Sequence, residues 1–388
     1  MDVDYTPEQK ALQKELRAFV DAHIRDEADG WDAAQAIPRA VFEQLGSEGL
    51  LATHVPETFG SRSLGAIEQG ILLEELGRGS VSLVSDLTVH AMCSEAALRF
   101  AAEEVRAELL PQMVKGEKLG AFALTEPNIG SDARNIETTA TPADGGVRLN
   151  GRKKWISFAQ MADVFLVVAQ CEGQPTAYLV PRKAEGVSVT PIRDMLGFRA
   201  AMIGELSFED VWVPTTHQVG RVGGGFTHVA GSCLDLGRYF VGWACIGLGQ
   251  ACLEASLHYA QNRRQFGRPI RDHQLVLEML ANMVTQLKAA RALAWRAGSL
   301  KAKGDPRSVM EISTAKYFTS RMVSQVANDA VQIHGAHGCG PEFPVQRYFR
   351  DARITEIIEG SNQMQQIMIA KQAYLEYRRA LKSFAPRA

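Results

Sequence analysis

The sequence has little net charge and no paired cysteines, and these absences exclude several classes of protein. The 388 residues carry a formal net charge of −2, so nothing indicates the basic face that nucleic-acid binding requires. Six cysteines occur at positions 93, 171, 233, 245, 252 and 339, and none belongs to a CxxC pair. A zinc site or a redox dithiol is therefore not expected. The cysteines are interpreted as free thiols of a reducing compartment.

A secretion signal and a long apolar run are also missing. The N-terminus, MDVDYTPEQKALQ, is acidic where a signal peptide has a basic start. No apolar run is predicted to reach membrane-spanning length. We therefore expect a cytoplasmic protein without a membrane span.

Helical spacing of apolar residues dominates the chain up to about residue 120. Leu12, Leu16 and Phe19 recur three or four positions apart, which predicts an amphipathic helix. This helix is expected to begin at Thr6, with Pro7 at its first position and the Gln9 side chain reaching back to the cap.

The spacing changes twice further along the chain. Between about 121 and 230 the period is two, in segments such as VRLNGRKKWISF and GELSFEDVWVP that are bounded by turn residues. From 231 helical patterns return, and small residues in LGRYFVGWACIGLGQACLEA permit close helix contact. The last predicted helix carries MQQIMIAKQAYLEYRRAL (364–381).

This order predicts an α+β multidomain protein. We expect an N-terminal all-α domain over 1–120, a middle antiparallel β domain over 121–230 and a C-terminal four-helix bundle over 231–388. The order of the domains says little about function by itself.

One carboxylate stands in an unusual setting. In ITEIIEGSNQMQQ, Glu359 follows two isoleucines and precedes Gly360. Such a charge is paired, exposed to solvent or held for proton transfer. Taken alone, the pattern favours a solvated residue at a turn.

Four separated stretches together resemble the acyl-CoA dehydrogenases, a family of flavin enzymes. They are FALTEPNIGSD (122–132), NGRKKWISFAQMADVFLV (150–167), YAQNRRQFGRPIRDHQ (259–274) and AVQIHGAHGCGPEFPVQRYFRDARITEIIEGSNQ (330–363). The resemblance covers nearly the whole chain and agrees with the α–β–α order. It implies an FAD between the β domain and the bundle, and oxidation of an acyl thioester at the carbons next to the carbonyl.

The resemblance implies that Glu359 is the catalytic base. It occupies the place of the family's glutamate that removes the α-proton, while a hydride leaves the β-carbon for the flavin N5. Removal of water would raise the pKa of this carboxyl and make it a better base. Ile357 and Ile358 are expected to form the dry wall around it.

Some family members carry the base on a bundle helix instead, in an LDxER-like stretch. Here that stretch contains Asp235, Gly237 and Arg238. Gly237 has no side chain, so Glu359 is the only candidate base that the motifs offer.

The resemblance also assigns residues to the cofactor and the substrate. Thr125 would bond the flavin pyrimidine edge, Trp155 would stack on the ring and Ser157 would bond near N5. FAD contacts across subunits are expected from Arg263, Gln265, Phe266 and Gln332, and contacts near the adenosine from Ser361 and Gln363. Substrate contacts are expected from Ser131, which could also reach the cofactor, and from Asp235, Arg238 and Gly360.

Several functions remain open at this point. The first is dehydrogenation of an acyl-CoA, and the second is the same reaction on an acyl chain tethered to an acyl carrier protein in a natural-product pathway. A flavin oxidase or monooxygenase on the same fold is less favoured, because such relatives tend to lose the glutamate. A non-enzymatic scaffold would have little reason to keep the base and the flavin contacts. The resemblance further implies electron-transfer flavoprotein as acceptor and a homo-oligomer, a tetramer or a dimer.

Overall fold

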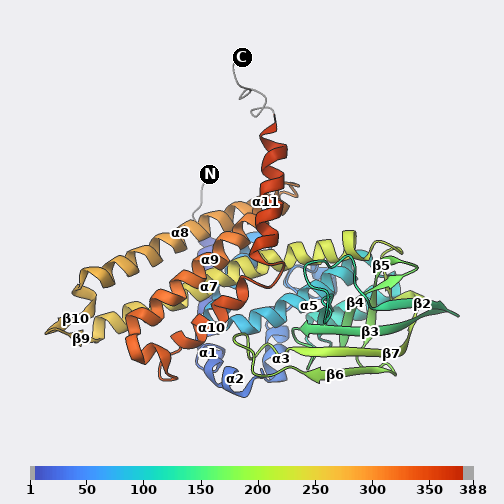
Figure 1. The fold of residues 1–388 in the computed structure, drawn as a ribbon, viewed down its shortest axis with the longest axis horizontal. Coiled ribbons are helices and arrows are strands. Elements are labelled where there is room, and N and C mark those ends of the chain that lie inside the picture. Colours follow the sequence, from blue (N-terminus) through green and yellow to red (C-terminus); the bar gives the residue numbers. More distant parts are fainter. Residues whose placement is uncertain (1–4, 379–388) are drawn as a thin grey trace, which may run out of the picture.

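The computed structural model describes residues 5–378, and it contains a helical N-terminal part, a sheet and a C-terminal helical part (Figure 1). This confirms the predicted fold class. The predicted end of the last helix, at 379–381, lies outside the described residues. Helices of the N-terminal part are α1 (Pro7–His23), α2 (Ala28–Ala34), α3 (Arg39–Ser47), α4 (Ala66–Gly79), α5 (Val81–Phe100) and α6 (Glu103–Val114).

Helix α1 begins where the sequence predicts. The Gln9 backbone N–H donates to the Thr6 hydroxyl at 3.2 Å, and the Thr6 N–H donates to the Gln9 side chain at 3.1 Å. This reciprocal pair satisfies two donors that a helix start otherwise leaves without partners.

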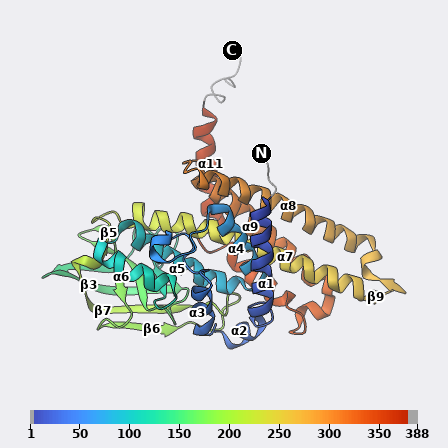
Figure 2. The ribbon, with the colours of Figure 1, turned by 180° about the vertical axis from the view of Figure 1, so that it is seen from behind.

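The middle of the chain forms one eight-stranded sheet with the order β6-β7-β3-β2-β4-β5-β8, and β1 pairs with β4. Most neighbouring strands are antiparallel, as predicted, but the β1–β4 pair and the single β2–β4 bridge are parallel. Figure 2 shows α5 and α6 beside this sheet. The strands are β1 (Gly120–Ala123), β2 (Thr139–Ala143), β3 (Gly146–Ile156), β4 (Val164–Cys171), β5 (Gln174–Pro181), β6 (Val187–Pro191), β7 (Gly204–Pro214) and β8 (Gln218–Val219).

The C-terminal part is organised around one long helix, α7, which packs against α4, α5, α8 and α9. Two glycines allow its close approach to α4, since a side chain on Gly247 would overlap the Glu74 carbonyl and one on Gly77 would come 2.6 Å from the Ala244 carbonyl. The bundle elements are α7 (Gly231–Asn262), β9 (Arg264–Gln265), β10 (Arg268–Pro269), α8 (Gln274–Ala302), α9 (Ser308–His334), α10 (Val345–Thr355) and α11 (Asn362–Glu376).

One segment has the length and composition of a membrane span. It runs over Gly225–Asn262, that is, α7 with the turn before it, and 78% of its apolar window is buried inside the protein. The prediction that no segment reaches this length and composition was therefore wrong. Packing of α7 against four helices accounts for its apolar character.

Candidate active site

Glu359 lies in the short turn between α10 and α11 and has a left-handed backbone. Its φ is 57°, and Gly360 follows with a φ of 81°. A left-handed residue with a side chain costs roughly 1–2 kcal/mol, so other contacts must hold it. The Glu359 carbonyl accepts hydrogen bonds from Arg238 Nε and from Gln365 Nε2, each at 3.2 Å. Helices α7 and α11 thus fix the turn that presents this side chain.

The Glu359 carboxyl is desolvated and has no hydrogen-bond partner among residues 5–378. Although part of the residue is accessible, its Oε2 atom is buried without a hydrogen bond. A side chain on Gly237 would overlap the Met92 methyl group and this Oε2, and would lie 2.7 Å from Glu359 Cδ. Burial raises the pKa of Glu359 to about 7, although the charges of Arg238 and Lys316 act in the opposite direction. A carboxylate with this pKa is suited to act as a general base near neutral pH.

The residues that shield this carboxyl from water differ from the predicted ones. Ile357 is 54% exposed and points away from the interior, while Ile358 is partly buried. Met92 of α5 and the Cα of Gly237 on α7 cover the carboxyl instead. The prediction was therefore wrong for Ile357 and stays a prediction for Ile358.

One face of α5 connects this carboxyl to the sheet. Ser85 donates a hydrogen bond to the Ser157 hydroxyl at 3.1 Å, and Met92 reaches the Glu359 carboxyl. Ser85, Val89 and Met92 share one helix face, and seven residues span about 10 Å. Ser157 and Glu359 therefore stand at the two ends of one short wall. Since Ser157 accepts from Ser85, its own O–H remains free to donate outward.

Trp155 is turned out of the sheet by a bulge in β3. Lys153 pairs with Leu206 and Ile156 with Gly204, so β3 has one extra residue between these pairs. Trp155 takes a φ of 62° in this bulge, and its side chain is 49% exposed. Exposure argues against a core role for this indole, whose ring has Lys154 Nζ 5.0 Å from its centroid.

A buried ion pair ties the Thr125 segment to the same strand. Lys153 Nζ donates to Glu126 Oε1 at 2.7 Å and to the Leu124 carbonyl at 3.0 Å. Glu126 also accepts from the Thr138 N–H at 2.9 Å. Because Thr125 lies between the two residues that Lys153 holds, this pair sets the distance between Thr125 and the Trp155 bulge.

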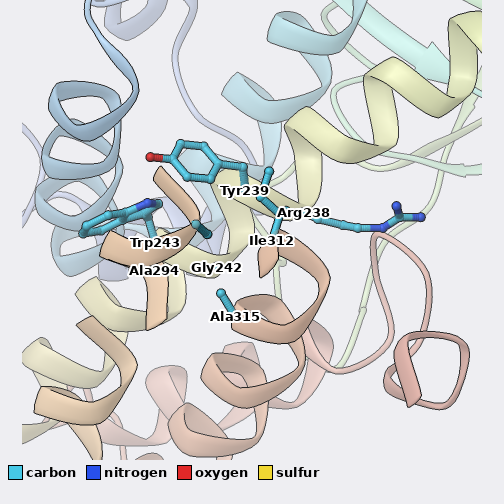
Figure 3. Close-up of a pocket in the computed structure, with 8 residues that line it drawn as sticks. Arg238, Tyr239, Gly242, Trp243, Ala294, Ile312 and Ala315 are labelled. Carbon is cyan, nitrogen blue, oxygen red and sulfur yellow. The ribbon is translucent and has the colours of Figure 1, made fainter. Parts of the chain in front are cut away.

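The predicted substrate residues Asp235 and Arg238 bond to each other. Arg238 Nη1 donates to Asp235 Oδ1 at 2.9 Å, and burial raises the pKa of Asp235 despite the neighbouring guanidinium. In Figure 3, Arg238 points away from Tyr239 and Trp243, which border a small apolar gap between α7, α8 and α9. The structure thus places Arg238 behind the Glu359 turn, and its contact with substrate stays a prediction.

The other predicted residues of this region lie around the turn and a surface loop. Ser361 caps α11 by accepting the Met364 N–H at 3.4 Å, and Gln363 is exposed in the first turn of that helix. Ser131 is exposed between β1 and β2. Ser361 lies two residues from Glu359, whereas nothing in the chain ties Ser131 to that turn.

The predicted intersubunit residues lie at the far end of the bundle. Arg263, Gln265 and Phe266 are exposed at the β9–β10 hairpin (Figure 1), Phe266 to 94%. Along α7, 26 residues or about 39 Å separate Gly237 from Arg263. Gln332 is exposed at the same end, where His334 stacks on Tyr259 at 4.3 Å. One chain therefore does not bring these residues to the Glu359 turn.

Around the Glu359 site, the side chains fit a flavin. Trp155 offers an exposed indole in a left-handed bulge, Ser157 follows it two residues later and bonds to α5, and Glu359 has a buried Oε2 without a partner among residues 5–378. These groups fit the class of flavin-dependent oxidoreductases.

Comparison with known proteins identifies the family. Models of the acyl-CoA dehydrogenase N-terminal, middle and C-terminal domains match residues 6–117, 121–211 and 223–374. The chain is 35% identical over 380 residues to glutaryl-CoA dehydrogenase of Desulfococcus multivorans (95% of this chain, 97% of the relative). It is 34% identical over 376 residues to benzylmalonyl-CoA dehydrogenase of Aromatoleum aromaticum strain EbN1 (96% and 99%).

A solved structure extends the comparison to the cofactor. Glutaryl-CoA dehydrogenase of Mycobacterium smegmatis in complex with FADH2 superimposes with a TM-score of 0.91 at 27% identity, covering 95% of each chain. The chain belongs to the acyl-CoA dehydrogenase family, and its cofactor is FAD.

Sequence reasoning missed the supporting residues of this site. Met92 and Lys316 lie far in sequence from the Glu359 turn that they support, and Lys153 lies 27 positions from its partner Glu126. The signal in the sequence was the presence of charged residues among apolar ones in predicted helices and strands. Such a pattern indicates a buried charge but does not identify the residue that pairs with it.

Proposed function

We propose that this protein α,β-dehydrogenates an acyl-CoA thioester and that Glu359 removes the α-proton. The observation that carries the proposal is the buried, unpaired Oε2 of Glu359 at one end of the α5 wall whose other end is Ser157. The left-handed turn at Glu359 supports it, because strained backbone persists where other contacts hold it, often at functional sites.

The proposed reaction removes a proton and a hydride from the acyl chain. The α-proton moves to the Glu359 carboxylate, and a double bond forms between the α- and β-carbons. FAD, when bound, supplies the acceptor for the hydride that leaves the β-carbon. We propose electron-transfer flavoprotein as the next acceptor.

The chain's own residues orient this chemistry. Within residues 5–378, the Glu359 backbone N–H has no acceptor, so it can donate to the thioester carbonyl as negative charge grows there. Thr125, Trp155 and Ser157 are proposed to hold the flavin, and Ser131, Asp235, Arg238 and Gly360 to contact the substrate.

We also propose a cytoplasmic homo-oligomer, with a tetramer as the preferred form. Support comes from four exposed residues: Arg263, Gln265 and Phe266 at the β9–β10 hairpin, where Arg263 is about 39 Å from Gly237 along α7, and Gln332 near the C-terminal end of α9. Such residues reach an FAD only if it belongs to a neighbouring chain.

Anaerobic bleaching of the yellow protein tests the proposal. Matched panels of acyl-CoA and acyl-carrier-protein substrates, from four to sixteen carbons, would be mixed with the holoenzyme in a stopped-flow instrument. We expect bleaching by at least one acyl-CoA. If only the acyl-carrier-protein substrates bleach the flavin, the substrate is a carrier-bound acyl chain instead of an acyl-CoA. No bleaching by either panel would contradict the proposed dehydrogenation.

A further inference from the structure

One face of α9 supplies a row of donors to the segment that carries Glu359. Lys316, Ser320 and Ser324 are spaced four residues apart and therefore lie on the same side of the helix. Ser320 donates to Asn362 Oδ1 at 2.9 Å, and Ser324 donates to Glu356 Oε1 at 2.6 Å. Both ends of the 356–362 segment are thus bonded to one helix.

Lys316 makes the contact nearest to the base. Its side chain is fully buried, and Nζ donates to the Gly360 carbonyl and to Asn362 Oδ1, each at 3.2 Å. Both acceptors are neutral. A buried ammonium normally pairs with a carboxylate. Here the Lys316 ammonium donates to two groups of the turn, and within residues 5–378 no hydrogen bond joins it to the Glu359 carboxyl.

We propose that Lys316 is a positioning residue for Glu359, which fixes the left-handed turn through the Gly360 carbonyl and places a cation behind the base. This inference rests on the proposed function, because it assigns Lys316 a part in the same proton transfer.

The cation and the base affect each other's protonation. Burial lowers the pKa of Lys316 to about 8, against the charge of Glu359, so Lys316 is mostly protonated at neutral pH. Its charge favours the ionised form of Glu359. Loss of this charge must therefore raise the pKa of Glu359.

Other titratable groups around Glu359 come from α7, from the segment that carries Glu359 and from α5. Helix α7 contributes Asp235 and Arg238, which form a pair, together with the neutral thiols of Cys233 and Cys245. The turn's own segment contributes Glu356, and α5 places apolar Met92 at the carboxyl and Glu95 and Cys93 near Cys233. Arg238 stays in every variant below, so a change reports on Lys316.

Three variants separate charge from hydrogen bonding. Lys316→Met removes both, Lys316→Gln keeps a donor without the charge, and Ser320→Ala removes a neighbouring donor without changing charge. The readouts are kcat/KM from pH 5.5 to 9 and a direct titration of Glu359. The titration uses the carboxyl infrared band that the Glu359→Gln variant lacks.

We expect both Lys316 variants to move the acid limb of kcat/KM and the infrared titration to higher pH. A rise of about one pH unit would lower kcat/KM about fivefold at pH 7 and leave it nearly unchanged at pH 9. The Gln variant should keep more of the high-pH rate than the Met variant. Ser320→Ala should leave the limb in place.

The inference is overturned if the folded Lys316→Gln holoenzyme titrates like the wild type, or if both variants lose rate equally at every pH. Retention of the FAD spectrum shows that a variant is folded. If Lys316→Met does not fold, the titration of Lys316→Gln tests the inference by itself. Normal bleaching by Glu359→Gln would instead overturn the proposed function, so the two failures are distinguishable.

Discussion

The sheet and the bundle each bury a glutamate near a buried lysine, and the two pairs are built in opposite ways. In the sheet, Lys153 Nζ bonds the Glu126 carboxylate directly at 2.7 Å. In the bundle, Lys316 Nζ bonds the carbonyl of Gly360 at 3.2 Å and leaves the neighbouring Glu359 carboxyl free.

This difference separates a structural carboxylate from a reactive one. Burial alone would raise the pKa of Glu126, but the charge and bond of Lys153, together with backbone donors, lower it below its usual value. Burial of Glu359 raises its pKa to about 7 because nothing bonds its Oε2. The same residue type therefore holds the loop after β1 to strand β3 in one region and is available for proton transfer in the other.

Removal of the free carboxyl gives the largest expected effect. In Glu359→Gln, bleaching by a good acyl-CoA substrate should slow by about 10²–10⁴-fold, the usual contribution of a general base, while FAD stays bound. Stopped-flow absorbance measures the rate. Glu356→Gln, three residues away and bonded to Ser324, is the matched control and should bleach within tenfold of the wild type. A Glu359→Gln rate close to the wild type would falsify the base assignment.

Removal of the paired carboxylate should affect folding. Glu126→Gln leaves the buried Lys153 charge without its counter-ion, which costs about 3–5 kcal/mol of unfolding free energy. Chemical denaturation of the protein measures this loss. The exposed Glu137→Gln, whose carboxylate bonds only Asn128 through its side chain, should change stability by less than about 1 kcal/mol. A loss of less than about 1 kcal/mol in Glu126→Gln would mean that the Lys153–Glu126 pair does not hold the loop after β1 to β3.

Filling the space beside the free carboxyl should be harmful at one glycine and harmless at another. Gly237→Ala would push on Met92 and Glu359 and should cost about 1–3 kcal/mol as well as slowing bleaching. Gly242→Ala lies on the same helix, and its new methyl group would meet only atoms 3.9 Å away. Thermal unfolding and bleaching of both variants check this contrast. Equal behaviour of the two would show that the Glu359 carboxyl does not occupy the space beside Gly237.

The distal hairpin should affect the cofactor without affecting the fold. Arg263 is exposed, so Arg263→Ala should leave the melting temperature unchanged. Loss of one charged hydrogen bond, about 1.5–3 kcal/mol, should weaken FAD binding by roughly ten- to a hundredfold. Arg264→Ala, next to it in the hairpin, is the control. An FAD dissociation constant that is the same in Arg263→Ala and the wild type would remove this contact from the proposal.

The sequence predicted the elements of the fold, and the family resemblance indicated Glu359 as the base, which stays a proposal; neither predicted the surroundings of Glu359. Periodicity and turn residues are local properties, so the α–β–α order and the Thr6 cap were accessible. Met92 covers Glu359 from 267 positions away in the chain, and no local pattern reports such a contact. The prediction for Ile357 was wrong for the same reason, since neighbours in a turn point in different directions.

The pH dependence of the wild-type enzyme tests the central claim most directly. Glu359 must be ionised to accept a proton, so kcat/KM should be constant above its pKa and fall tenfold per pH unit below it. We predict a limb centred at about pH 7, where burial places the pKa of Glu359. A limb at pH 4.5, the ordinary value of a solvated glutamate, or a flat profile between pH 5.5 and 8 would contradict the claim that an unpaired, desolvated carboxylate performs the reaction.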